Sequence, residues 1–248
     1  MAEPLLDIRG LYKSFGGVTA TDNVSLDIQQ GELHAIIGPN GAGKTTLIAQ
    51  LSGDLPSDDG QVLLDGRDIT TVPTHRRSHF GMARSFQITS VFMNMSVIDN
   101  VSLAVQSHDG TSFRFWQPAA TEKRLRAPAM EILEKVGLAE RAGTPAAAMS
   151  HGERRQLELA MALATKPRFL LLDEPMAGMG AEESAAMVDI LKGLKGDKTI
   201  LLVEHDMDAV FALADRISVL VYGRVIATGK PEDIRSNKAV RDAYLGED

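Results

Sequence analysis

The sequence predicts an α/β fold built on a mostly parallel sheet, and three observations support this prediction. Apolar strand-like runs and helical patterns alternate in the last third of the chain, at residues 169–173, 182–194, 199–203, 207–214 and 217–221. Such alternation is typical of parallel strands covered by helices. In addition, a glycine-rich turn separates a strand-like run from a helical run near the start, and the middle of the chain is mainly helical.

The N-terminal part of the chain is rich in strand-like runs, at residues 5–11, 24–28, 33–37, 61–64 and 82–86. From about residue 88 to about residue 165 the apolar residues instead recur at three- and four-residue spacing, in residues 97–106, 121–136 and 153–165. We therefore expect one domain over residues 1–248, in which residues 88–165 form a helical sub-domain inserted into the sheet.

Composition and charge exclude several classes of site. The 248 residues carry a net charge of −7, which argues against a nucleic-acid partner. The sequence has no cysteine, so disulfides, cysteine-ligated zinc and thiol catalysis are excluded. The first residues lack the basic and apolar regions of a signal peptide, and the apolar runs at 169–172 and 217–222 are far shorter than a membrane span. If the protein works at a membrane, we expect another chain to supply the spans.

The glycine-rich turn fits the phosphate-binding pattern G-x-x-x-x-G-K-[ST]. A strand-like run precedes it and a helical run, residues 45–53, follows it, which is the context that the pattern requires. Backbone N–H groups of the loop and of the helix start would surround phosphate oxygens. Lys44 would reach the β- and γ-phosphates, and the Thr45 hydroxyl would bind Mg²⁺. The predicted nucleotide-binding residues are Gly38, Pro39, Asn40, Gly41, Ala42, Gly43, Lys44, Thr45 and Thr46.

A second glycine–lysine pair does not fit this pattern. Five residues instead of four separate Gly223 from Gly229, and Pro231 stands where serine or threonine should follow the lysine. We interpret residues 223–229 as a turn between strands and a helix, so the sequence predicts a single nucleotide loop.

Polar side chains end two of the predicted strands. Asp173 and Glu174 follow an apolar run whose carboxyl end would face a ligand in an open α/β sheet. Asp173 fits a second-sphere partner of Mg²⁺, and Glu174 could orient or deprotonate a water that attacks a γ-phosphate. His205 follows the run 201–203, where it could contact the γ-phosphate and hold Glu174 and the water in line. The alternatives are solvated acids at a strand end and a histidine that merely starts a helix.

Two further candidates flank the helical middle. Gln87 ends the strand-like run 82–86, where a glutamine could meet Mg²⁺ or the attacking water at a mechanical junction. Ser150 and Glu153 form the capping-box pattern S-x-x-E ahead of a helix with an apolar stripe. A capped helix start beside Gly152 is also a phosphate site. Because the chain already has one phosphate loop, this second site suggests action on the nucleotide of another subunit.

Aromatic residues gather in the least regular part of the sequence, residues 111–120. These are Phe113, Phe115 and Trp116. We interpret the cluster as local packing of a loop, and the alternative is an exposed contact with a partner.

These motifs, in this order, resemble those of an ATP-binding subunit of an ABC transporter, and the resemblance covers essentially the whole chain. It implies a P-loop ABC ATPase fold with a mostly parallel core sheet, an N-terminal antiparallel β part and an inserted helical sub-domain. It also implies ATP and Mg²⁺ as substrate and cofactor, with hydrolysis coupled to transport. Phe15 matches the aromatic residue that stacks on adenine in this family, although ordinary core packing is an alternative for it.

The resemblance implies a working unit of several chains. Two ATPase subunits, identical or related, would face each other so that each ATP lies between Lys44 and Thr45 of one subunit and Ser150 and Gly152 of the other. Gln87 and the helical insertion would pass the closing motion to transmembrane permease subunits. The implied location is cytoplasmic, peripheral on the inner face of the cell membrane.

Within the family, the chain is most similar to the branched-chain amino acid uptake group. The likeness lies in residues 81–87, in His151 and Glu153 of the signature, in residues 174–179 and in the ending 241–247. It implies an importer that is served indirectly by a solute-binding protein. Lipopolysaccharide export and urea uptake are alternatives, since the corresponding ATPases are similar too.

Two non-transport classes are less well supported. Soluble ABC ATPases of DNA repair or translation usually carry long coiled coils or two ATPase domains, and the sequence predicts neither. A nucleotide-binding regulator that does not hydrolyse is disfavoured because Glu174 and His205 are both present.

Three positions of the signature and one position after Glu174 depart from the common family pattern. Met149, His151 and Glu153 replace three of the five usual signature residues, whereas Ser150 and Gly152 are kept. Gly180 stands where an aspartate usually crosses the dimer interface, which puts the cross-subunit hydrogen bonds of that aspartate in question.

Overall fold

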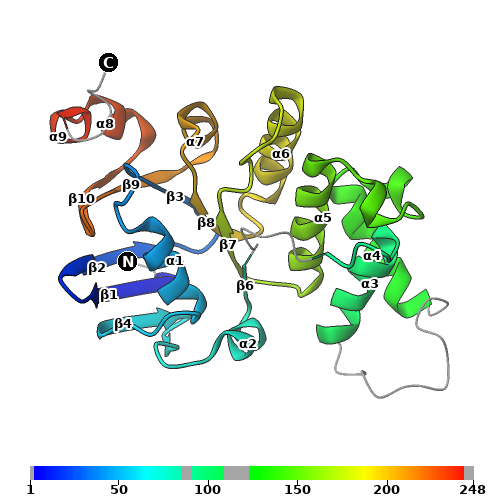
Figure 1. Ribbon diagram of the computed structural model, residues 1–248, viewed down its shortest axis with the longest axis horizontal. Helices are drawn as coiled ribbons and strands as arrows, with labels where there is room; N and C mark the ends of the chain where they lie inside the picture. The colour runs from blue at the N-terminus through cyan, green and yellow to red at the C-terminus, as the bar shows by residue number, and fades with distance from the viewer. Residues whose placement is uncertain (1–2, 85–90, 109–122, 243–248) are drawn as a thin grey trace.

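Parallel strands form the central layer of the fold (Figure 1). The computed structural model describes residues 3–84, 91–108 and 123–242. Within these residues the larger sheet has the order β10-β9-β3-β8-β7-β6, in which all neighbours are parallel except β10 and β9. Its strands are β3 (Leu33–Ile37), β6 (Met82–Arg84), β7 (Phe169–Asp173), β8 (Thr199–Val203), β9 (Arg216–Val221) and β10 (Arg224–Gly229).

The strands in the middle of this sheet are buried on both faces. Every residue of β3, β7 and β8 is buried, as expected for parallel strands covered on both sides. Successive side chains point into two different cores, because strand residues alternate between faces. Leu170 and Leu172 join the core shared with the helices, whereas Phe169 and Leu171 join the core shared with the second sheet.

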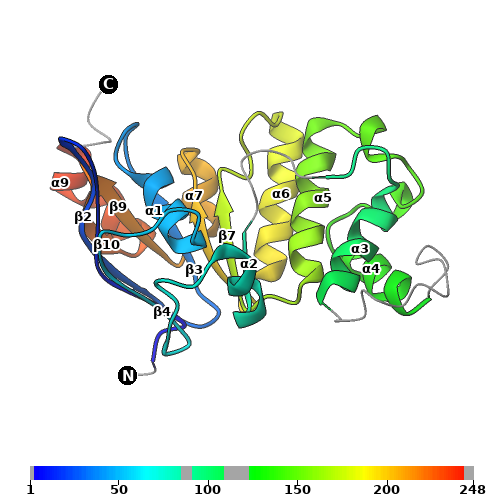
Figure 2. The ribbon, with the colours of Figure 1, turned by 60° about the horizontal axis from the view of Figure 1, so that its bottom comes forward.

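The second sheet is antiparallel and comes from the N-terminal part of the chain. Its order is β2-β1-β4-β5, and irregular register along β1 and β2 bends the ribbon. Apolar residues of α1 (Lys44–Ser52) pack with both sheets in one core, so this helix is held between them (Figure 2). The strands are β1 (Leu6–Phe15), β2 (Val18–Ile28), β4 (Asp59–Leu64) and β5 (Arg67–Asp68).

Helices gather on the other side of the central sheet. Helix α3 (Val97–His108) contacts both α4 (Lys123–Lys135) and α5 (His151–Ala164), and α6 (Ala181–Leu194) lies between α5 and the strands (Figures 1 and 2). The limits of the helical sub-domain, residues 88–165, remain a prediction. The shorter helices are α2 (Thr74–Arg77), α7 (Met207–Leu213), α8 (Pro231–Ser236) and α9 (Lys238–Val240). In the described part of the chain, no helix has both the length and the apolar character needed to cross a membrane.

The predicted fold class is confirmed, with one local error. The parallel sheet, the antiparallel N-terminal part and the helical middle are all present. Residues 223–229, however, do not form only a turn: Gly223 turns the chain and β10 then pairs antiparallel with β9. This strand was not predicted because its sequence lacks a continuous apolar run. It is an edge strand, and its residues are exposed or half-buried.

Buried polar side chains help to fix β3 beside β9. His34 is fully buried, with Nε2 2.8 Å from Ser218 Oγ and Nδ1 2.9 Å from Glu32 Oε1. Arg216, which is the register partner of His34, donates a 3.0 Å hydrogen bond to Asp27. A shifted register would leave these buried groups without partners, which is costly. The network therefore helps to hold the start of β3 beside β9.

Replacing Phe169 should test the core between the two sheets. Phe169 is fully buried beside α1, so Phe169→Ala leaves a cavity and should lower the free energy of unfolding by about 3–5 kcal/mol. Phe15→Ala is the matched control, because Phe15 is 51% exposed and should lose less than about 1 kcal/mol. Urea unfolding of both variants measures the difference, and equal losses would contradict this account of the core.

Candidate functional site

The loop between β3 and α1 is shaped by two close backbone approaches. A Cβ atom on Gly38 would lie 2.0 Å from the Leu220 carbonyl oxygen, and one on Gly43 would lie 2.0 Å from the Ala20 carbonyl oxygen. Both residues also have positive φ, so glycine is required at each. Within the described residues, no side chain caps the start of α1. The first amides of this helix therefore face outward as donors for an anion.

Lys44 lies across this loop. Its ammonium donates to the carbonyl oxygens of Gly38 at 2.5 Å and Pro39 at 3.0 Å. Burial lowers the pKa of Lys44, and the negative charges of Glu174 and Asp173 oppose this shift. Lys44 and both strand-end carboxylates therefore influence one another electrostatically, and they follow parallel strands that end at the same edge of the sheet.

Asp173 is a buried carboxylate, and one of its oxygens has no hydrogen-bond partner among the described residues. Its Oδ2 makes no hydrogen bond to any described residue, and the nearest cation, Arg84 Nη2, is 3.6 Å away. Burial raises the pKa of Asp173, whereas Arg84 lowers it. Arg84 also donates to Ser52 Oγ at 2.8 Å and pairs with Asp54. A buried acceptor without a donor fits hydrogen bonding to a water on a metal ion.

The donor set beside Asp173 fits Mg²⁺ better than a metal held by protein alone. The described residues contain no group of three or more His, Cys, Asp or Glu side chains that could hold a metal ion. Mg²⁺ commonly binds through one or two protein oxygens, phosphate oxygens and retained waters. The Thr45 hydroxyl, at the start of α1, and the Asp173 carboxylate, at the end of β7, would supply this kind of partial shell. Gln87, the third residue predicted to contact Mg²⁺ or its waters, lies outside the described residues.

Glu174 and His205 lie next to each other at the same edge. The Glu174 amide donates to the Val203 carbonyl at 2.8 Å, and the residue adopts a φ of 47°, which is uncommon outside glycine. Its carboxylate is 29% exposed and lies 3.7 Å from Nδ1 of His205, which is 61% exposed. The two side chains can therefore reach a reactant from solvent and adjust to it. This geometry suits a carboxylate that orients or deprotonates a water.

A third carboxylate, which the sequence analysis missed, supports this pair. Glu204 is buried, and its Oε1 accepts from the Met176 amide at 3.0 Å while Oε2 accepts from the His205 amide at 3.0 Å. One side chain thus connects the loop after Glu174 to the loop that carries His205. Its position directly after a buried strand, where a charge needs internal donors, was the available signal.

Ser150 and Gly152 do not join the other predicted residues in one chain. The predicted capping box is present: Ser150 Oγ accepts from the Glu153 amide at 3.1 Å, and the Ser150 amide donates to the Glu153 carboxylate at 2.8 Å. Both ribbon views show β7 and α6 between α1 and α5 (Figures 1 and 2). Helix α5, which begins directly after Ser150, is therefore separated from α1 by other elements of the same chain.

Phe15 lies at the exposed end of β1. Its ring is 51% exposed and the Lys13 ammonium lies 5.6 Å from the ring centroid. The alternative of ordinary core packing is therefore wrong, and the ring is open to stacking by a ligand. The aromatic cluster at Phe113, Phe115 and Trp116 lies outside the described residues.

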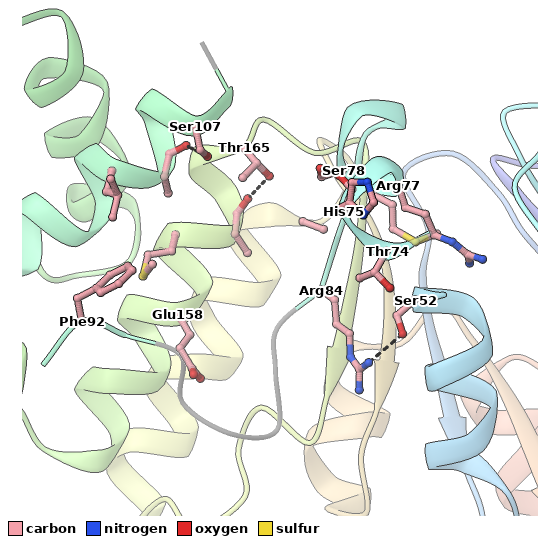
Figure 3. Close-up of a pocket in the computed structure, with 16 residues that line it drawn as sticks. Ser52, Thr74, His75, Arg77, Ser78, Arg84, Phe92, Ser107, Glu158 and Thr165 are labelled. Atoms are coloured by element: carbon pink, nitrogen blue, oxygen red, sulfur yellow. Dashed lines mark hydrogen bonds between the residues drawn. The ribbon is translucent and has the colours of Figure 1, made fainter. Parts of the chain in front are cut away.

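A separate cavity of about 480 Å³ opens between the central sheet and the helices (Figure 3). Its lining comes from the end of α1, from β6 and α2, and from α3 and α5, and its apolar part includes Leu103 and Met161. Phe92 at its edge is 50% exposed. Arg84 lines this cavity, and its Nη2 also lies 3.6 Å from Oδ2 of Asp173. One side chain therefore connects the wall of the cavity to the carboxylate of Asp173.

Comparison with known proteins identifies the family. The family model described as "ABC transporter" matches residues 21–177, and the model "Branched-chain amino acid ATP-binding cassette transporter" matches residues 224–248. The chain is 37% identical over 254 residues to the high-affinity branched-chain amino acid transport ATP-binding protein BraF of Pseudomonas aeruginosa. It is 38% identical over 259 residues to LivG of Escherichia coli, a protein of the same description. Both alignments cover 100% of each chain.

Solved structures lead to the same family. The ADP conformation of MJ1267, an ATP-binding cassette of an ABC transporter, aligns with a TM-score of 0.86 at 29% identity, covering 99% of this chain and 100% of that one. A nucleotide-free ATP-binding cassette from an ABC transporter aligns with a TM-score of 0.83 at 29% identity, covering 98% and 99%. With the loop at Lys44 and the carboxylates beside it, these matches show that the chain belongs to the ABC transporter family and is one of its ATPase subunits.

Proposed function

We propose that this chain hydrolyses ATP, with Mg²⁺, to energise a membrane importer of branched-chain or related amino acids. The observation that carries the proposal is that the Lys44 loop, Asp173 with Glu174, and His205 follow neighbouring parallel strands that end at one edge of the sheet, with His205 3.7 Å from Glu174. The cargo class is supported by full-length similarity to two branched-chain amino acid transport proteins and by the family match at residues 224–248.

Each residue would have a distinct part in hydrolysis. The loop amides and Lys44 would hold the β- and γ-phosphates, and Phe15 would stack on the adenine. When bound between the phosphates and the Thr45 hydroxyl, Mg²⁺ would offset the charge that develops on the phosphate oxygens. Asp173 would accept a hydrogen bond from a water of that ion. Glu174 would orient and deprotonate the attacking water, with His205 holding the γ-phosphate in line.

A second ATPase subunit, identical or related, would complete the site. Ser150 caps the start of α5, which β7 and α6 separate from α1, and this supports an arrangement in which the ATP on one subunit would be met by the Ser150 helix start of the other. ATP would then draw the two subunits together through charge-assisted hydrogen bonds from both sides. Loss of the γ-phosphate would let them separate.

The cavity beside Arg84 would receive a short helix of a permease subunit. Its apolar lining of Leu103 and Met161 suits the apolar face of a helix, and its wall continues through Arg84 to Asp173. Gln87 and the helical insertion would transmit movement between this cavity and the nucleotide. The chain would accordingly act on the cytoplasmic side of the membrane, bound peripherally to its permeases.

Glu174→Gln should stop hydrolysis while leaving nucleotide binding intact. The amide cannot take a proton from the attacking water, so steady-state ATP hydrolysis should fall about 10²–10⁴-fold. Glu134→Gln, at an exposed position of α4, is the matched control. Phosphate release and fluorescent-nucleotide binding measure the two properties, and turnover near that of the control would contradict the role of Glu174.

His205→Ala should likewise retain nucleotide binding and lose most hydrolysis, by about tenfold or more. The reason is the loss of one donor beside the γ-phosphate and of the neighbour 3.7 Å from Glu174. The same two assays apply, and near-normal turnover with unchanged nucleotide affinity would count against this role.

Purification from native membranes tests the transporter assignment. A tagged chain, extracted in mild detergent, should bring down two multi-span proteins, a related ATPase and a solute-binding protein. Lipopolysaccharide-assembly proteins or a urea transporter would overturn the cargo class. Recovery of only soluble proteins, ribosomes or DNA would overturn the transporter function.

The same purification tests the cavity. Leu103→Asp places a charge in the apolar lining and should reduce permease recovery by about tenfold or more. Ile226→Asp on β10 is the matched control, because Ile226 is 39% exposed and Leu103 is 38% exposed. The melting temperature of each variant checks folding. Equal permease recovery from the two variants would contradict docking at this cavity.

A further inference from the structure

A carboxylate of the same chain lies on the helix start that carries Ser150. Glu183, in the first turn of α6, accepts a 2.9 Å hydrogen bond from Ser150 Oγ through Oε1 and a 3.3 Å hydrogen bond from the Gly180 amide through Oε2. Hydrogen bonding from Ser150, with smaller contributions from the Gly180 and Gly152 amides, lowers the pKa of Glu183. The carboxylate is therefore held as an anion at the N-terminus of α5, where negative charge is favoured.

The Glu183 carboxylate also covers Gly152. A Cβ atom on Gly152 would lie 2.4 Å from Cδ of Glu183 and 2.6 Å from its Oε1. These distances place the carboxylate directly against the backbone of the glycine. In both ribbon views, α5 and α6 run side by side, so the contact bridges the two helices (Figures 1 and 2).

The Ser150 hydroxyl can serve only one anion at a time. It has a single proton, which it donates to Glu183, and its oxygen already accepts from the Glu153 amide. Under the proposed function, the γ-phosphate on a partner subunit would approach Ser150 and Gly152. That phosphate and the Glu183 carboxylate would then need the same donors, and their like charges would repel.

We propose that Glu183 competes with the γ-phosphate of a partner subunit's ATP for Ser150 and Gly152. The Glu183 carboxylate must therefore leave these two residues before the two ATPase subunits close on ATP. The proposal rests on the proposed function, because it assumes that a partner's ATP meets Ser150. It makes Glu183 a positioning residue that sets how much ATP is needed for closure. The loop between Glu174 and Gly180 also contacts this helix start, since His151 Nε2 lies 3.2 Å from the Ala177 carbonyl oxygen.

Glu183 is also the third residue of α6, where it caps the helix start at Gly180. If Glu183 served only as this cap, its substitution would lower the stability of the protein and would not lower the ATP concentration needed for half-maximal hydrolysis. Competition predicts that this ATP concentration falls. Glu183→Gln separates the two, because the amide keeps the size and one acceptor oxygen but loses the charge.

The test uses the membrane complex that co-purifies with the tagged chain. The measurement is the ATP concentration that gives half-maximal hydrolysis. Glu183→Gln should lower it about fivefold, the effect of weakening one charge-assisted hydrogen bond. Glu182→Gln is the matched control, since Glu182 is exposed one residue earlier on the same helix and loses the same charge. An unchanged or higher value for Glu183→Gln than for Glu182→Gln overturns the proposal.

Failure of the proposed function gives a different result. If hydrolysis by the complex is not abolished by Glu174→Gln, the proposed ATPase mechanism fails and the competition fails with it. If Glu174→Gln abolishes hydrolysis and Glu183→Gln changes nothing, only the competition fails.

A second measurement examines the contact without turnover. In the full-length chain without nucleotide, Glu183→Ala should speed hydrogen exchange of the backbone amides in residues 150–154 relative to Glu182→Ala, because the anion that covers them is lost. Equal exchange in the two variants overturns the proposal, since it would show that Glu183 does not occupy this helix start.

Discussion

The parallel pairing of β3, β8 and β7 is the constraint on which the rest of the structure depends. In this register Ile36 and Asp173 both stand opposite Val203, so the three strands end at the same level. The glycine loop, Glu174 and Glu204 are simply the next residues after those ends. A one-residue slip of any strand would move its side chains to the other face and separate these groups. The buried contact of His34 with Ser218 and the burial of every residue in the three strands oppose such a slip.

Much of the fold was predictable because its central strands are mostly apolar. Residues 33–37, 169–173 and 199–203 are strands with the predicted limits, since apolar residues dominate each run and glycine or acidic residues end it, even though the polar His34 lies within the first of them. The edge strand β10 was not predicted, because a half-exposed strand has no such signal. The phosphate loop was recognisable from its own short pattern, which depends on local backbone geometry rather than on distant contacts.

The contacts of the candidate site were less accessible from sequence, because they join distant residues. Glu204 was not predicted as a site residue. It is buried, however, and by accepting from the amides of Met176 and His205 it links two loops. The approach of Arg84 to Asp173 and the contact of Glu183 with Ser150 each join segments that no local pattern relates. Gln87 remains a prediction from sequence position. Such contacts follow from the packing of α5 and α6 and from the strand order, neither of which a motif contains.

The strand order also has a consequence for how the chain is made. The central strand β3 belongs to the first part of the chain, but its partners β8 and β9 belong to the last part. During synthesis from the N-terminus, the five residues of β3 must wait for most of the polypeptide to emerge before either edge is paired. The turn at Gly223, whose amide donates to the Ala42 carbonyl, is later still. A nascent chain therefore carries its complete nucleotide-loop sequence long before that loop can be shaped, and during this time its unpaired strand edges are exposed to pairing with other chains.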